Sequence, residues 1–541
     1  MGIFKDKKKI LAIANFIDAT FVWRDNCFES RVCSRTIYIR NFLIQMSYIL
    51  GISAFYHDSA ATLIHNGKII AAAQEERFTR KKHDSSYPFN AVDFVLRFSN
   101  LKLSEVDHII FYEKPFLKFE RLLETYVALA PKGFAQFSKA MPIWLSEKLF
   151  QKKLILDSLK QNDENFKDEN KLLFSEHHLS HAASAFYPSP FKEAVILTAD
   201  GVGEWATTTV AIGKENNIEI KKEIHYPHSI GLLYSAFTYY IGFKVNSGEY
   251  KVMGLAPYGE PKYENKIKDN LIDIKNDGSF RLNQKFFNYA TGLTMTNTKF
   301  HELFGQKPRD GTNEKITQFH MDIAASIQKV TEDVMLKIAI SLRKEFNITN
   351  LCLAGGVALN CVANGKILNQ KIFDNIWIQP AAGDAGGSLG AALAFWHIEQ
   401  KKDRIISNTD DMKGSYLGPE YSQKEIEENL TNLGAKFEIL NEEKLIEKTA
   451  SDLSNGFAIG WFQGRMEFGP RALGARSIIG DSRSSTMQKN LNLKVKYRES
   501  FRPFAPSVLA EDVSDWFNIN SKSPYMLLVA DVNDKKKNKY D

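Results

Sequence analysis

The sequence has few cysteines and no long apolar run. Its 541 residues contain four cysteines, and no two of them form a CxxC pair. A disulfide scaffold is therefore not expected, and the cysteine usage favours a reduced, cytoplasmic protein. No run of eighteen or more apolar residues occurs, so a membrane-spanning helix is not expected either.

The sequence also lacks a large excess of charge of one sign. The formal net charge is +6, but residues 1–45 hold eight basic and four acidic residues, which leaves only +2 for the remaining chain. A general electrostatic field for nucleic acid is not indicated. Neither a nucleic-acid partner nor a membrane partner is expected, and any basic patch must be local.

Residues 1–45 are expected to lie outside the fold. Four lysines precede an apolar stretch over residues 10–23, which loosely imitates a secretory signal peptide. Asp18 interrupts that stretch, and no cleavage site of the usual type follows it. Met46 stands just before the first clear strand, so we expect Met46 to be the natural start.

The strand pattern indicates a duplicated α/β fold. A chain of this length is expected to form two or three domains. Residues 48–73 predict strand, polar loop, strand, tight turn and strand, with Asn66-Gly67 as a type I′ hairpin turn. The same succession recurs over 194–222, with the Gly-rich GVGEW as the loop. Two copies of one unit predict two halves around a cleft, although two similar hairpins can also arise by chance.

The remaining segments are predicted more coarsely. Residues 116–170 are expected to be a mostly helical, solvated insertion without obvious chemistry. Residues 320–346 predict a core helix, because their apolar residues recur at helical spacing. The segment IWIQPAAGDAGGSLGAALAF predicts a strand, a Gly-rich loop and a helix from near Gly387. The polar stretch 398–415 predicts a domain boundary, followed by a second α/β segment.

The segment EHHLSHAASAF carries a candidate metal site. His177 and His181 are four residues apart, so on a helix both imidazoles lie on one face, whereas His178 points elsewhere. Asp384, in a Gly-rich loop, is a suitable third ligand for a divalent metal that also binds substrate oxygen. The spacing alone also fits core or capping histidines, and Asp384 also fits a helix N-cap.

Three further segments are candidates for anion binding. The loop DGVG, with Asp200, Gly201 and Gly203, follows a strand and can approach phosphate closely. The segment AGGVALNCVAN places two glycines before a helix N-terminus. In NSGEYKVMGLAPYGEP, Glu249 and Lys251 are candidates for a substrate or phosphate site, or for a surface ion pair.

A basic cluster lies between residues 465 and 502. Nine Lys or Arg residues stand there against three acidic residues. Gly, Pro and Phe residues interleave with these charges in GPRALGARS and FRPFAP, which indicates fixed geometry. Arginine matches phosphate bidentately. Because aromatics for base stacking are few, a small phosphorylated ligand is favoured over RNA.

Taken together, these segments resemble the O-carbamoyltransferase family, which includes nodulation proteins and antibiotic-tailoring enzymes. The matching segments run in order from about residue 47 to residue 508. They are GISAFYHDSAATL, QEERFTRKKHDSSYP, EHHLSHAASAFYPSPF, LTADGVGEW, NSGEYKVMGLAPYG, GGVALNCVANGKI, QPAAGDAGGSLGAAL, GRMEFGPRALGARSI and KYRESFRPFAPSV.

The resemblance implies two domains and a three-step reaction. It implies an actin-like carbamoyl-transfer domain over 46–400, similar to the tRNA threonylcarbamoyl-transfer enzyme, and a YrdC-like domain over 415–541. In such enzymes carbamoyl phosphate is cleaved to carbamate and phosphate. Carbamate then reacts with ATP to give carbamoyl adenylate and pyrophosphate. The carbamoyl group finally passes to a hydroxyl of a sugar or other small molecule.

The resemblance also assigns residues to roles. It implies His177, His181 and Asp384 as ligands of a divalent metal, iron or similar. The first hairpin loop, with His57 and Asp58, would activate the acceptor hydroxyl, and Lys251 is the third catalytic candidate. The expected ATP contacts are Asp200, Gly201, Gly203, Gly355, Gly356 and Asn360. The expected carbamoyl-phosphate contacts are Arg465, Arg471, Lys496, Arg498 and Arg502.

Two departures from the family pattern bear on function. The extension at 1–45 is foreign to the pattern, and the family usually continues beyond residue 541. We therefore expect the YrdC-like domain to be C-terminally incomplete and its use of carbamoyl phosphate to be impaired. An actin-like small-molecule kinase, a non-catalytic remnant and a tRNA-modifying enzyme remain alternatives. The acceptor and the oligomeric state, for which a homodimer is possible, are not evident from the sequence.

Overall fold

A computed structural model describes residues 47–144, 150–519 and 521–537 of the chain. The expectation for residues 1–45 lies outside the described residues. Residues 47–541 form one compact unit. Among the described helices, none is long and apolar enough to cross a membrane.

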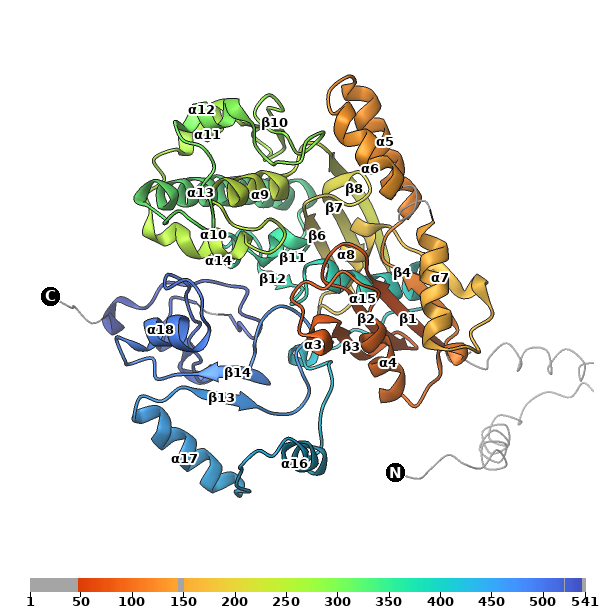
Figure 1. Cartoon of the computed structure of the whole chain (residues 1–541), viewed down its shortest axis with the longest axis vertical. Coiled ribbons are helices and arrows are strands. Elements are labelled where there is room, and N and C mark those ends of the chain that lie inside the picture. The colour runs from red at the N-terminus through yellow and green to blue at the C-terminus, as the bar shows by residue number, and fades with distance from the viewer. Residues whose placement is uncertain (1–46, 145–149, 520, 538–541) are drawn as a thin grey trace, which may run out of the picture. The chain divides into compact units, whose positions relative to one another are not determined.

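Two five-stranded mixed sheets make up the centre of the fold (Figure 1). In the first sheet the strand order is β3-β2-β1-β4-β5, and in the second it is β12-β11-β6-β7-β8. The first sheet comprises β1 Tyr48–Ser53, β2 Ala60–His65, β3 Lys68–Gln74, β4 His108–Phe111 and β5 Leu172–Phe174. The second comprises β6 Glu193–Ala199, β7 Ala206–Lys214, β8 Asn217–His225, β11 Asn350–Ala354 and β12 Asn375–Ile378.

The two sheets have the same topology. In each, a first strand pairs antiparallel with a meander of two strands and parallel with the first of two later strands. The tight turn between β2 and β3 is Asn66-Gly67, and both residues have positive φ, as a type I′ turn requires. The duplicated α/β unit predicted from the sequence is therefore confirmed at the level of strand order and direction.

Two helices pack between the sheets. Helix α15 (Asp384–Ala394) contacts β1, β2 and β4 of the first sheet, and α8 (His177–Phe186) contacts β6, β7 and β11 of the second. They also contact each other closely, because a Cβ added at Gly390 would lie 1.6 Å from the Ser180 carbonyl oxygen. Helix α15 begins at Asp384, so the predicted start near Gly387 is three residues too late: Asp384 lies in the first helical turn rather than in a loop.

The other helices surround this core. Helix α13 (Gln318–Phe346) confirms the predicted core helix and packs against α9, α10, α11 and α14. The remaining helices before residue 400 are α3 Glu76–Thr79, α4 Phe89–Phe98, α5 Pro115–Leu129, α6 Phe134–Trp144, α7 Gln151–Asn162, α9 Ile230–Tyr240, α10 Glu249–Leu255, α11 Glu264–Asn270, α12 Thr298–Phe304 and α14 Cys361–Asn369. A small hairpin pairs β9 (Ile272–Ile274) with β10 (Phe280–Leu282).

The segment after residue 415 is less buried than the rest. It contains α16 (Gln423–Asn432), α17 (Glu442–Ser454), α18 (Met487–Asn490) and α19 (Val513–Trp516), with β13 (Ile459–Phe462) antiparallel to β14 (Arg476–Ile479). Neither α16 nor α17 has a buried residue. These helices and strands match the second α/β segment that the sequence predicts after the polar stretch.

Candidate metal and transfer site

Four chain segments meet where strands of both sheets end. They are the loop after β1, the loop after β6, and the first turns of α8 and α15, which follow β5 and β12. Because the two sheets share one topology, these segments form two equivalent pairs, one from each half. The chemistry-bearing residues of the two halves therefore converge between the sheets.

His177, His181, Asp200 and Asp384 form the centre of this site. The Nε2 atom of His177 lies 3.1 Å from His181 Nε2 and 3.1 Å from Asp200 Oδ2. The Oδ1 atom of Asp384 lies 3.8 Å from His177 Nε2 and 3.7 Å from His181 Nε2. All four ligand atoms lie within 4.8 Å of one another. The sequence prediction that two histidines and Asp384 come together is matched, and Asp200 joins them.

The four donors fit a divalent metal. Ligand atoms about 2.0–2.2 Å from one ion lie roughly 2.8–3.6 Å apart when they subtend about 90–110°. The observed separations are close to this range, and two imidazoles with two carboxylates are a common donor set for divalent transition metals. Burial disfavours a charged His177, yet Asp200, Glu113 and Asp384 raise the pKa of its imidazole to about 10. The site therefore favours positive charge.

The neighbouring His178 forms its hydrogen bond outside the cluster. Its Nδ1 lies 2.6 Å from Thr209 Oγ1, away from the cluster. Burial and the adjacent His177 and His181 hold the pKa of His178 well below its usual range. The prediction that His178 points elsewhere is confirmed.

Buried charges surround the cluster. Glu204 accepts hydrogen bonds from the backbone N–H groups of His177 and Lys114, and so ties the start of α8 to the chain before α5. Lys118 on α5 lies 2.7 Å from Glu113, whose Oε2 is 3.7 Å from His177 Nδ1. Arg121, one turn further on, donates to the Gly203 carbonyl.

Helix α5 therefore corrects one expectation. The sequence predicts a solvated insertion without chemistry, but Lys118 and Arg121 are only 6% and 5% exposed. The sequence does not indicate the burial of these two residues, because α5 has charged and apolar residues at the spacing of an ordinary surface helix. Only the tertiary structure shows that this face lies against the cluster.

His57 and Asp58 lie beside the cluster, as predicted for the first hairpin loop. His57 Nε2 is 3.7 Å from Asp384 Oδ2, and His57 Nδ1 is 3.0 Å from Asp58 Oδ2. Burial disfavours a charged His57, yet Asp384 and Asp58 raise its pKa to about 9. The ring thus connects Asp58 to the ligand Asp384.

The Gly-rich loops are connected to the cluster through Asp200. Its Oδ1 accepts from the Gly356 N–H at 3.1 Å, while its Oδ2 faces His177. Gly355 has φ +83°, and a Cβ there would lie 2.3 Å from the Ala199 carbonyl oxygen. Gly201 has no atom within 4 Å of an added Cβ. Asn360 caps α14 at the Ala363 N–H and exchanges two 3.0 Å hydrogen bonds with Gln328.

The predicted carbamoyl-phosphate residues separate into two groups. Lys496, Arg498 and Arg502 lie near one another. Burial and the nearby charges of Arg498, Arg502 and Lys82 lower the pKa of Lys496. Arg502 and Lys82 both lie over the Tyr250 ring, 4.4 and 4.6 Å from its centroid. Lys82, which the sequence did not single out, thus joins this cationic cluster.

Arg465, Arg471 and Lys251 have other contacts. Arg465 donates to the backbone carbonyls of Gly418, Leu417 and Ile70. Arg471 donates to the Leu359 carbonyl at 3.3 Å. Lys251 forms a 2.6 Å ion pair with Glu499.

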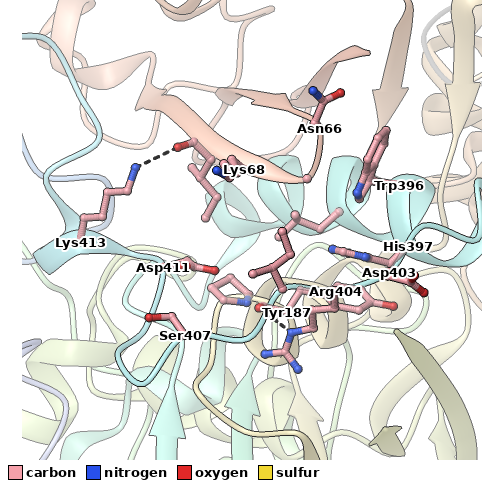
Figure 2. A pocket seen from close by; sticks show the side chains of 15 residues that line it. Asn66, Lys68, Tyr187, Trp396, His397, Asp403, Arg404, Ser407, Asp411 and Lys413 are labelled. Atoms are coloured by element: carbon pink, nitrogen blue, oxygen red, sulfur yellow. Dashed lines mark hydrogen bonds between the residues drawn. The ribbon is translucent and has the colours of Figure 1, made fainter. Parts of the chain in front are cut away.

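A separate cavity of about 170 Å³ lies at the other end of α8 and α15. Figure 2 shows Tyr187, Trp396, His397 and Arg404 around it. Arg404 donates to the carbonyls of Tyr187, Phe191, Phe186 and Ser189, and so caps the C-terminal end of α8. None of the predicted site residues lines this cavity.

Comparison with known proteins adds three observations. The family model for the carbamoyltransferase N-terminus matches residues 48–393, and that for the carbamoyltransferase C-terminus matches residues 450–541. An uncharacterised protein of Synechocystis sp. is 60% identical over 493 residues, which are 91% of this chain and 80% of that protein. The nodulation protein NolNO of Sinorhizobium fredii is 36% identical over 90% of this chain and 68% of its own length.

Two solved structures show a weaker likeness. Component A of the (R)-2-hydroxyglutaryl-CoA dehydratase of Acidaminococcus fermentans has 15% identity and a TM-score of 0.34 over 65% of this chain and 98% of its own. HypF of T. kodakarensis has 14% identity and a TM-score of 0.32 over 67% of this chain and 50% of its own. These TM-scores are too low to carry an argument. The two family models together match most of the sequence, and the chain belongs to the carbamoyltransferase family.

Proposed function

We propose that this chain is an ATP- and metal-dependent O-carbamoyltransferase. It would take carbamoyl phosphate as donor, form carbamoyl adenylate, and pass the carbamoyl group to a hydroxyl of a sugar or other small molecule. The observation that carries this proposal is the convergence of His177, His181, Asp200 and Asp384 beside His57 in a chain of the carbamoyltransferase family.

In this proposal the carbamoyl group is transferred in two displacement steps. A carbamate oxygen attacks the α-phosphorus of ATP, and pyrophosphate leaves. The acceptor hydroxyl oxygen then attacks the carbamoyl carbon, the bond to the phosphate oxygen breaks, and AMP leaves with that electron pair. A divalent metal held by the four ligands would polarise a substrate oxygen.

The residues around the cluster have distinct tasks in this proposal. With its Nδ1 directed at Asp58, His57 presents Nε2 toward the cluster. A divalent metal held by Asp384 and Asp200 would offset two of the carboxylates that raise the pKa of His57, so that Nε2 can accept the proton of the acceptor hydroxyl. The Gly356 N–H, held by Asp200, and the open Gly201 support a nucleotide at the ends of β6 and β11. The two matching sheets support an actin-like arrangement of the transfer domain.

The cationic cluster of Lys82, Lys496, Arg498 and Arg502 supports a phosphorylated donor. Neighbouring cations repel one another and lower the pKa of Lys496, and a bound anion would reduce this repulsion. In the proposed scheme this cluster, within a YrdC-like domain, holds carbamoyl phosphate while water converts it to carbamate and phosphate.

The nucleotide product tests the proposal. The full chain is incubated with ATP, a divalent metal and carbamoyl phosphate, and in parallel with ammonium carbamate, which bypasses donor cleavage. Carbamate-dependent release of AMP and pyrophosphate is expected. ADP as the only nucleotide product would instead show a kinase, and no turnover with either donor would show a non-catalytic protein.

A further inference from the structure

His83, Asp58 and His57 form a continuous row that ends at the metal cluster. His83 Nδ1 lies 2.7 Å from Asp58 Oδ1, and His57 Nδ1 lies 3.0 Å from Asp58 Oδ2. Burial would raise the pKa of Asp58, but the two imidazoles hold it well below its usual range, so the carboxyl is ionised. Because a carboxylate only accepts, both Nδ1 atoms donate to it. The His57 ring is thereby oriented with its Nε2 on the side of Asp384.

Among the described residues, the ring of His83 forms one hydrogen bond, the bond to Asp58. Its Nε2 is buried and has no hydrogen-bond partner among the described residues. Its backbone N–H donates to Glu76 Oε2, which fixes the main chain rather than the ring. The ring is therefore placed for its bond to Asp58.

His83 is not needed to hold its loop in place. Two backbone hydrogen bonds of 2.9 Å, from Phe55 to Ser85 and from Ser59 to Asp84, already join the two loops. Asp58 and His83 both have left-handed backbone conformations, with φ of 53° and 55°. Such conformations are strained in non-glycine residues and cluster at functional sites.

We propose that His83 is a positioning residue for acceptor activation. By donating to Asp58 it fixes the carboxylate, and through the carboxylate it holds the His57 ring with Nε2 toward the metal cluster. This role rests on the proposed transferase function. It concerns only the step in which a hydroxyl loses its proton, because adenylation of carbamate removes no proton from an acceptor.

Comparison of the two half-reactions tests this role. Exchange of labelled pyrophosphate into ATP, with ammonium carbamate, reports adenylation. AMP release with water as acceptor reports transfer to a hydroxyl. In His83→Ala we expect AMP release to fall about 10- to 100-fold, as on loss of other supporting hydrogen bonds in active sites, while pyrophosphate exchange stays within two-fold.

Two further variants separate positioning from folding. In His83→Asn an amide N–H can replace Nδ1–H, so most of the AMP release should return. Lys81→Ala, on the same loop, should change neither half-reaction. An equal fall of exchange and release in His83→Ala, or no fall in either, would overturn the positioning role. Absence of both half-reactions in the unaltered chain would instead overturn the transferase function itself.

Discussion

At the residue scale, Asp200 has the most connections in the site. One of its carboxylate oxygens faces His177 and His181, and the other accepts from the Gly356 N–H. Burial would raise the pKa of this carboxyl, but His177 and His181 hold it well below the usual range. Asp200 therefore joins the metal ligands to the loop proposed for the nucleotide.

Replacement of Asp200 by Ala should weaken the binding of both the metal and ATP. Loss of one carboxylate from four donors is expected to lower metal affinity by at least about 10-fold, and release of the Gly356 loop should weaken ATP binding as well. Metal and ATP affinities are measured by calorimetry on the full chain. The matched control is His178→Asn, a change at a buried histidine outside the cluster. If Asp200→Ala bound metal as the unaltered chain does, Asp200 would not be a ligand.

At the element scale, α8 and α15 place the candidate metal ligands. Helix α8 begins after β5 of the first sheet and packs on the second, whereas α15 begins after β12 of the second sheet and packs on the first. Each helix is also fixed by contact with the other. The approach at Gly390 is so close that no side chain fits between α15 and the Ser180 carbonyl. The spacing of His177 and Asp384 is therefore set by backbone packing.

The variant Gly390→Ala should force the two helices apart. Overpacking of a close contact costs about 1–3 kcal/mol or more, and the resulting shift should also lower metal affinity. Urea unfolding gives the stability, and calorimetry gives the affinity. Gly201→Ala is the control, because its Cβ meets no atom within 4 Å. Equal stability of the two variants would contradict the packing argument.

Elements could be predicted from the sequence better than contacts could. The Asn66-Gly67 turn and the apolar strand patterns define the two meanders because turn chemistry and burial act locally. The spacing of His177 and His181 likewise predicts a shared face. The additional ligand Asp200 could not be recognised, since a strand-ending Asp before glycines also fits a nucleotide loop. Its position beside His177 depends on how the two sheets pack.

At the scale of the whole compact unit, the chain after residue 415 contacts the part that carries the candidate metal site at several points. Lys251 pairs with Glu499, and Arg77 donates to the Gly469 carbonyl. Asn364 on α14 donates to the Leu527 carbonyl, and the Val529 N–H donates to Cys361. These contacts hold the cationic cluster against the segment over 246–258, which contains α10. Among these contacts, the partly buried Lys251–Glu499 ion pair is closest to the cationic cluster, because Glu499 directly follows Arg498 in the sequence.

A double-mutant cycle on this pair decides the role of Lys251. Partly exposed ion pairs contribute about 0.2–1 kcal/mol, which corresponds to at most about a five-fold change in rate. If Lys251 acts through its ion pair, the rate of carbamoyl-phosphate-dependent AMP formation should fall two- to five-fold in each of three variants. These are Lys251→Met, Glu499→Gln and the double variant, and the fall should be the same in all three. With ammonium carbamate as donor, all three should keep the unaltered rate. A much larger loss in Lys251→Met than in Glu499→Gln would instead show that the Lys251 ammonium group contacts the substrate, as the sequence predicts.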